Sequence, residues 1–226
     1  MNNDFALGDS ENFLSEVIEN SFDRSITIHS IIRDRVAESN PQRALQIPNH
    51  IYVSDPKQRM HTAMVEEIAR IAHFGQVDKL GVDYIEHPRA VAIRAEMAVP
   101  SAKGFDLASS LHVKWAALLH DVVEDTPFTI KDLSLLGVPD SLLSTISILT
   151  RTPRMDSDLY YSRIFSNKHA RVVKIADMMH NCAPFRTALL DENTRVRLIG
   201  KYSKGIEKLT NGYPDDRQAF KNMTGI

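Results

Sequence analysis

WAALLHDVVEDT, residues 115–126, begins as an apolar run typical of a buried helix and then carries four ionisable side chains before the chain turns at Thr126-Pro127. On one continuous helix these side chains would form two neighbouring rows, because the members of each pair lie four residues apart. The pairs are His120 with Glu124 and Asp121 with Asp125. Buried ionisable groups cost on the order of several kcal/mol unless each finds a partner. The stretch therefore predicts a point where all four converge, with a solvated helix end as the alternative.

Length and composition exclude several classes of protein. The 226 residues suffice for one main domain, and 27 basic against 29 acidic residues do not indicate a protein that binds nucleic acid or a membrane surface. The single cysteine, Cys182, excludes a disulfide framework and suits a reducing compartment. Neither a membrane-length apolar run nor a signal peptide is recognisable. We expect a cytoplasmic protein whose oligomeric state, a homo-oligomer included, stays open.

Apolar residues recur at helical spacing almost throughout, which predicts an all-α fold. We expect residues 1–52 to form a helical appendage and residues 53–226 to form the main domain. Ser54-Asp55-Pro56 resembles a helix start, Asp106 a cap, and Thr129 with Asp132 a capping box. The helices expected in the main domain cover residues 56–74, 88–97, 107–125, 130–136, 140–149, 158–165, 168–182 and 192–209.

Two further segments repeat the pattern of polar groups among apolar ones. In VVKIADMMHN, residues 172–181, one helical stripe carries Lys174, Asp177 and Asn181. An incidental hydrogen bond on a polar helix face would explain that stripe equally well. The other segment is YIEHP, where His87 precedes a proline; a lone histidine there is more often a capping or surface residue than a ligand.

Taken together, the clusters offer two imidazoles and two carboxylates, from His87, His120, Asp121 and Asp177. This set suits one Mn, Fe or Zn ion better than Ca or Mg. Four protein ligands would leave an octahedral ion with positions for water and for a substrate phosphate oxygen. Glu124 and Asp125 are then free to orient or deprotonate that water.

Three blocks of the sequence resemble the signature blocks of the HD-domain alarmone hydrolases, which comprise the hydrolase half of the RelA/SpoT homologues and the stand-alone small alarmone hydrolases. The blocks are AHFGQVDKLGVDYIEHPRAVA at 72–92, AALLHDVVEDT at 116–126 and VKIADMMHN at 173–181. The resemblance covers roughly residues 55–210, and both the order and the spacing of the blocks agree.

The resemblance implies an all-helical HD fold with a single divalent metal site, usually for manganese, with Zn²⁺ or Fe²⁺ as alternatives. It implies removal of the 3′-pyrophosphate from guanosine tetra- or pentaphosphate, giving GDP or GTP. Matched by position, the metal ligands are His87, His120, Asp121 and Asp177, and the catalytic acidic pair is Glu124 and Asp125. Asn181 matches a nucleotide contact.

Other residues are candidates for the substrate phosphates: Lys79, Lys174 and Arg151. His73 and His180 we expect to support the site rather than to bind metal. The chain departs from the family at Asp78, where a basic residue is usual, and at Asp83, Met178 and the Cys182-Ala183-Pro184 segment. These departures keep two alternatives open, namely another nucleotide substrate (an adenosine-type alarmone, NADPH or a nucleotide monophosphate) and a non-catalytic nucleotide-binding protein.

Overall fold

The computed structural model describes residue 37, residues 61–98 and residues 106–225 of the chain. The chain separates into two units, Met1–Met60 and His61–Ile226, and all the helices described below belong to the second. The predicted helices of the N-terminal appendage, and the predicted boundary at residues 52 and 53, lie outside the described residues. That division of the chain therefore stays a prediction.

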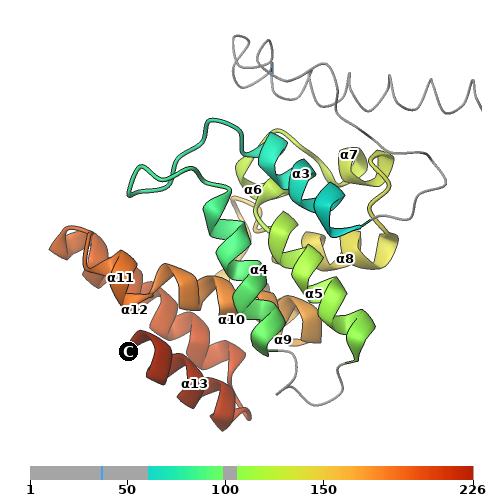
Figure 1. Cartoon of the computed structure of the whole chain (residues 1–226). Helices are drawn as coiled ribbons and strands as arrows, with labels where there is room; N and C mark the ends of the chain where they lie inside the picture. Colours follow the sequence, from blue (N-terminus) through green and yellow to red (C-terminus); the bar gives the residue numbers. More distant parts are fainter. Residues whose placement is uncertain (1–36, 38–60, 99–105, 226) are drawn as a thin grey trace, which may run out of the picture. The chain divides into compact units, whose positions relative to one another are not determined.

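The described residues form helices, without a strand; an isolated bridge joins Val77 and Asp83 in the loop before the second helix. This confirms the all-α prediction. No helix in the described segments is long and apolar enough to cross a membrane. The helices, labelled as in Figure 1, are α3 (Thr62–Ala72), α4 (Glu86–Ala98), α5 (Leu107–Leu119), α6 (Val122–Asp125), α7 (Ile130–Leu135), α8 (Asp140–Leu149), α9 (Ser157–Phe165), α10 (Lys168–Asn181), α11 (Pro184–Thr187), α12 (Glu192–Leu209) and α13 (Pro214–Thr224).

Local signals in the sequence account for several helix ends. The Asp106 side chain accepts a hydrogen bond from the Ser109 N–H and so caps α5, as predicted. Thr129 and Asp132 form the predicted capping box of α7. Gly137 has a φ of 89°, a left-handed conformation that suits glycine, and the chain leaves α7 there.

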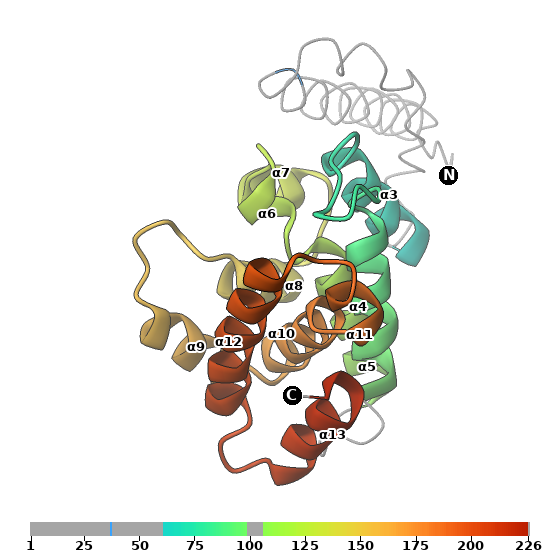
Figure 2. The same ribbon diagram turned by 90° about the vertical axis from the view of Figure 1, so that its left-hand side faces the viewer.

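The core lies where α10 packs against α4, α5, α8, α9 and α12. α4 also packs along α5, which α3 covers on another side, as Figures 1 and 2 show. Ile164 and Met178 are fully buried within this set of helices, as are Val113 and Leu119 of α5. Each such side chain contributes on the order of 1.5–3 kcal/mol through burial. The same packing holds the N-terminus of α4, the C-terminus of α5 and the middle of α10 next to one another.

At Gly205, α12 packs closely against side chains of α9 and α10. A Cβ atom built on this residue would lie 2.5 Å from the Tyr161 hydroxyl and 2.6 Å from the terminal methyl of Met178. A side chain larger than hydrogen therefore requires the Tyr161 and Met178 side chains, or the helices that carry them, to shift.

The structure corrects the prediction of one long helix through residues 107–125. α5 ends at Leu119, His120 and Asp121 form a turn, and α6 begins at Val122. His120 Nδ1 lies 2.7 Å from the Ala117 carbonyl oxygen, which in a continuous helix would accept from the Asp121 N–H. The histidine side chain thus takes the place of the backbone donor at the point where the helix is interrupted.

Three further differences concern helix positions. α3 begins at Thr62, after the extended residue His61, so the helix start predicted at Ser54-Asp55-Pro56 is not the start of α3 and lies outside the described residues. α11 and α13 were not predicted from the sequence, although both begin with a proline in the first turn, at Pro184 and Pro214.

Candidate active site

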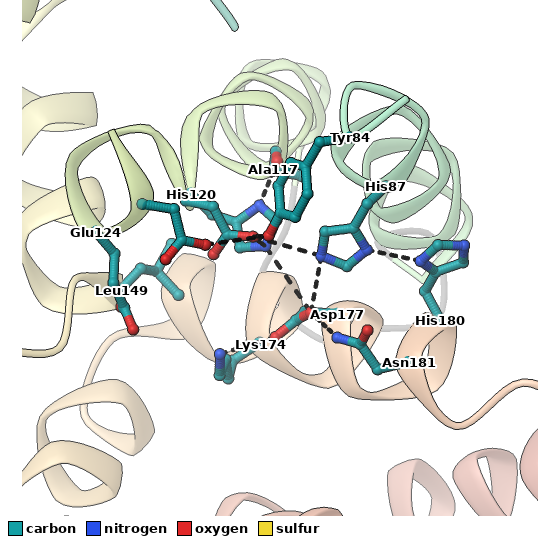
Figure 3. A network of polar contacts seen from close by, with 12 residues as sticks. Tyr84, His87, Ala117, His120, Glu124, Leu149, Lys174, Asp177, His180 and Asn181 are labelled. Carbon is teal, nitrogen blue, oxygen red and sulfur yellow. Dashed lines mark hydrogen bonds and ion pairs between the residues drawn. The ribbon is translucent and has the colours of Figure 1, made fainter. Parts of the chain in front are cut away.

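His87 enters the site from the first turn of α4 and is held by its outer ring nitrogen. The two Nδ1 atoms of His87 and His180 lie 2.7 Å apart, so one ring donates and the other accepts (Figure 3). Burial, together with the charges of His87, Arg186 and Arg94, lowers the pKa of His180 to about 3. His180 is therefore neutral and can accept from His87 Nδ1–H, which leaves His87 Nε2 facing the centre of the site. Burial alone would lower the pKa of His87, but Asp121 and Asp177 raise it above its ordinary value.

His120 enters from the turn between α5 and α6 and is almost completely buried. Its Nδ1 donates to the Ala117 carbonyl, so Nε2 faces the site, where it has no hydrogen-bond partner in the described structure. The nearest acidic oxygen, Asp121 Oδ2, is 3.0 Å away. Burial alone would lower the pKa of His120, but Asp121 and Asp177 raise it to about 10. The position thus favours a positive charge, which either a proton or a metal cation can supply.

Asp177 extends from α10 to the same point. Its Oδ1 is 3.2 Å from His87 Nε2 and 3.9 Å from His120 Nε2. Lys174 Nζ donates to Oδ2 at 2.8 Å, and Asn181 Nδ2 donates to Oδ1 at 2.6 Å, as the predicted stripe on α10 requires. Burial opposes ionisation of Asp177, but the Lys174 ammonium and the imidazoles hold its pKa well below the usual value. The carboxylate is therefore ionised.

The arrangement fits a small divalent cation. The ligand atoms of His87, His120 and Asp177 all lie within 4.8 Å of one another. Asp121 Oδ2 lies 3.0 Å from His120 Nε2 and 3.5 Å from His87 Nε2, so the fourth predicted ligand is at the same place. Atoms that share an ion at about 2.0–2.2 Å are typically about 3–3.5 Å apart. His120 Nε2 faces inward without a hydrogen bond to any described residue and lies beside the ionised carboxylates of Asp121 and Asp177. Such a set of donor atoms suits a divalent cation.

Glu124 and Asp125 lie on α6 at the edge of this centre. The Tyr84 hydroxyl is 2.7 Å from Asp121 Oδ2 and 3.1 Å from Asp125 Oδ2, and so connects the acidic pair to the centre. The Glu124 carboxylate accepts a 2.8 Å hydrogen bond from the Arg151 backbone N–H. Desolvation raises the pKa of both acids, and the charge of Asp121 raises it further. Raised pKa values suit groups that exchange protons near neutral pH.

A cleft of about 440 Å³ opens over the acidic groups. Lys79, Lys174 and Asn181, three of the four predicted substrate-binding residues, line it. The fourth, Arg151, contributes its backbone to Glu124, while its guanidinium donates to the Met155 carbonyl oxygen at 3.3 Å. The lining residues are Val77, Asp78, Lys79, Leu80, Tyr84, His87, Asp121, Glu124, Asp125, Lys174, Asp177, Asn181, Arg186, Leu190, Leu198, Lys201 and Tyr202.

Asp78 was noted from the sequence only as a departure from the family, and two other residues of the cleft, Arg186 and Lys201, were not predicted. Asp78 forms a buried ion pair with Arg186 of α11 at 2.8 Å and also accepts from the backbone N–H groups of Leu80 and Val82. Lys201 of α12 lines the cleft as well. Arg186 and Lys201 belong to no motif, and their positions depend on how α11 and α12 pack, so no sequence signal could have found them.

His73 and His180 lie where the sequence analysis expected supporting residues. His73 is the C-cap of α3 and its Nδ1 is 2.7 Å from Gln76 Oε1. The Gln76 amide in turn donates to the Asp125 carbonyl oxygen at 2.9 Å. This chain of contacts connects the end of α3 to the helix that carries the acidic pair.

Comparison with known proteins agrees with this geometry. Residues 84–182 match the HD domain family, a segment that contains both histidines and both carboxylates of the centre. A solved structure described as a metazoan ortholog of SpoT that hydrolyzes ppGpp has a similar fold, with a TM-score of 0.52 and 19% sequence identity over 74% of this chain and 96% of that one.

Among curated proteins, the guanosine-3′,5′-bis(diphosphate) 3′-pyrophosphohydrolase of Haemophilus influenzae is 32% identical over 143 residues. The bifunctional (p)ppGpp synthase/hydrolase SpoT of Escherichia coli K12 is 33% identical over 140 residues. Each match covers 57% of this chain but only 19% and 18% of those proteins. The matched region is thus about a fifth of these relatives.

Proposed function

We propose that this chain, as an HD-domain protein, is a metal-dependent hydrolase. Its proposed reaction removes the 3′-pyrophosphate from guanosine tetra- or pentaphosphate. The observation that carries the proposal is the group of His87, His120 and Asp177 ligand atoms within 4.8 Å, with Asp121 beside it, at a cleft that Glu124 and Asp125 line. The named activities of the relatives from Haemophilus influenzae and Escherichia coli support the choice of substrate.

In this proposal His87, His120, Asp121 and Asp177 hold one divalent ion, most simply manganese. When bound, such an ion lowers the pKa of a coordinated water and neutralises phosphate charge. The ligand set suits Mn²⁺, Zn²⁺ and Fe²⁺, and metal analysis distinguishes them.

The acidic pair performs the proton transfers. Glu124, oriented by the Arg151 N–H, accepts a proton as water oxygen bonds to the 3′-linked phosphorus. The bond between that phosphorus and O3′ breaks, O3′ takes up a proton from the acidic pair, and pyrophosphate leaves with GDP or GTP as the other product. The Tyr84 hydroxyl contacts both Asp125 and the proposed metal ligand Asp121, and so keeps the Asp125 carboxylate next to the metal centre.

Cationic and amide groups position the substrate. Lys174 and Asn181 lie beside Asp177 and reach the cleft, as Lys79 does from the loop before α4. Lys174 is the candidate contact for the cleaved pyrophosphate, since its ammonium lies 2.8 Å from a carboxylate of the centre. Arg151 is the weaker candidate, because its guanidinium donates to Met155.

The proposed setting is that of an alarmone-degrading enzyme of the stringent response, cytoplasmic and acting on a small nucleotide without nucleic acid or membrane. A homo-oligomer is compatible with this proposal. Size-exclusion chromatography with light scattering measures the oligomeric state directly.

The test is an assay of the purified protein, stripped with a chelator and reloaded with manganese, on guanosine 3′,5′-bis(diphosphate). We expect GDP and pyrophosphate in equal amounts, and loss of turnover in Glu124→Gln with nucleotide binding preserved. A panel with an adenosine-type alarmone, NADPH and nucleotide monophosphates tests the alternative substrates. Nucleotide binding without turnover of any substrate would identify a non-catalytic binding protein instead.

A further inference from the structure

Two lysines line the cleft and have no acidic partner among the residues that the structure describes. Lys79 lies in the loop between α3 and α4, and Lys201 lies on α12. Within residues 61–98 and 106–225, neither ammonium forms an ion pair. The other two cationic side chains that line the cleft are each paired with a carboxylate at 2.8 Å: Lys174 with Asp177 and Arg186 with Asp78.

The surroundings of Lys201 hold several positive charges. Burial, followed by repulsion from Lys174, Lys79 and Arg151, lowers the pKa of Lys201, which is only partly offset by Asp177. Like charges gathered in one cleft are unfavourable unless an anion compensates them. Because Asp177 already accepts from Lys174 and Asn181, the missing compensation at Lys201 is most simply an anionic group of the ligand.

The two unpaired lysines come from elements that contribute nothing to the candidate metal centre. That centre is built from α4, the turn after α5, and α10, whereas Lys79 and Lys201 come from the loop before α4 and from α12. Near Lys201 on α12, Leu198 and Tyr202 also line the cleft and give this wall apolar surface. The cleft therefore offers separate places for a phosphate at the metal centre and for a second anionic group.

We propose that Lys201, together with Lys79, binds the phosphate group of the substrate that is not cleaved, so that the cleft selects nucleotides with two separate phosphate arms. This inference rests on the proposed function. Lys201, on α12, then distinguishes a substrate with both 3′ and 5′ phosphates from one with 3′ phosphates alone.

The experiment compares Lys201→Ala with the unchanged protein on two substrates, guanosine 3′,5′-bis(diphosphate) and guanosine 3′-diphosphate. Losing a charge-assisted contact should lower kcat/KM for the first by about tenfold to a hundredfold and for the second by less than about threefold. Calorimetry with GDP, which retains the uncleaved arm, should show a similar loss of affinity. Lys201→Arg should restore most of the lost kcat/KM and most of the lost affinity for GDP.

Lys204→Ala is the matched control, because Lys204 is an exposed lysine of the same helix that does not line the cleft. An equal loss on both substrates, or an unchanged Kd for GDP in Lys201→Ala, would overturn the inference while the proposed hydrolase activity stands. If the unchanged protein hydrolyses neither substrate, yet Lys201→Ala weakens GDP binding, the proposed function fails and the second phosphate site is supported.

Discussion

His180 Nδ1 lies 2.7 Å from His87 Nδ1, so a histidine at the end of α10 fixes the ring of a histidine at the start of α4. The neutral His180 accepts from His87 Nδ1 and so keeps His87 Nε2 directed at Asp121 and Asp177. Such outer hydrogen bonds typically orient a metal ligand and raise its basicity.

His180→Phe should therefore lower manganese affinity by about tenfold to a hundredfold without unfolding the protein. Isothermal titration calorimetry measures the affinity, and circular dichroism checks the fold. His61→Ala, which removes an exposed histidine outside the centre, serves as the control. Equal affinities in all three proteins would mean that His180 only packs against His87.

Manganese affinity should rise with pH between about 6.5 and 8.5. The carboxylates around His120 raise its pKa to about 10, so in this range the metal-free ring holds a proton that an incoming ion must displace. We expect up to a tenfold gain per pH unit and the release of at least one proton per ion bound. Calorimetry in buffers of different ionisation enthalpy counts that proton; a pH-independent Kd would contradict the assignment of His120 as a ligand.

The same shift affects the stability of the metal-free protein. Because the pKa of His120 is above the value of 6.5 of an unperturbed histidine, the folded state binds the proton more tightly than the unfolded state. This contribution is fully present below about pH 6.5 and fades as the pH rises toward 10. Chemical denaturation of His120→Gln and of the unchanged protein at pH 6 and pH 9 should show a smaller pH dependence in the variant.

Tyr84→Phe should lower kcat by about tenfold, since it removes a hydrogen bond to charged groups at Asp121 and Asp125. The hydroxyl also lowers the pKa of Asp125, which burial raises. Its loss should move the acid limb of the pH–kcat profile to higher pH. Tyr213→Phe is the control, because that tyrosine is 45% exposed and lies outside the cleft. A fall in kcat with an unmoved acid limb would argue for a purely structural role.

Gly205→Ala should destabilise the protein by about 1–3 kcal/mol, because the added methyl group would meet Tyr161 of α9 and Met178 of α10. Gly200→Ala on the same helix meets nothing within 4 Å and should stabilise by about 0.5–1 kcal/mol through helix propensity. Urea denaturation measures both changes. If the two variants were equally stable, the close approach of α12 would not limit the packing.

The sequence alone was sufficient for what depends on neighbours along the chain. The caps at Asp106 and Thr129, and the stripe of Lys174, Asp177 and Asn181, follow from residue spacing on a helix, and the structure has them as predicted. The family resemblance also named the four residues that the structure brings together at one point. The caps and the stripe could be predicted because their contacts have a low sequence separation. The four residues of the centre are far apart in the chain and were named because they lie in recognisable motifs.

Tertiary packing decided the rest. The contact of His87 with His180 across 93 residues and the Asp78–Arg186 pair depend on side chains that meet only after α4, α10 and α11 have packed. The position of Lys201 at the cleft likewise depends on how α12 packs against α9 and α10. A residue's own sequence context does not specify such contacts, because their free energy comes from partners far away in the chain.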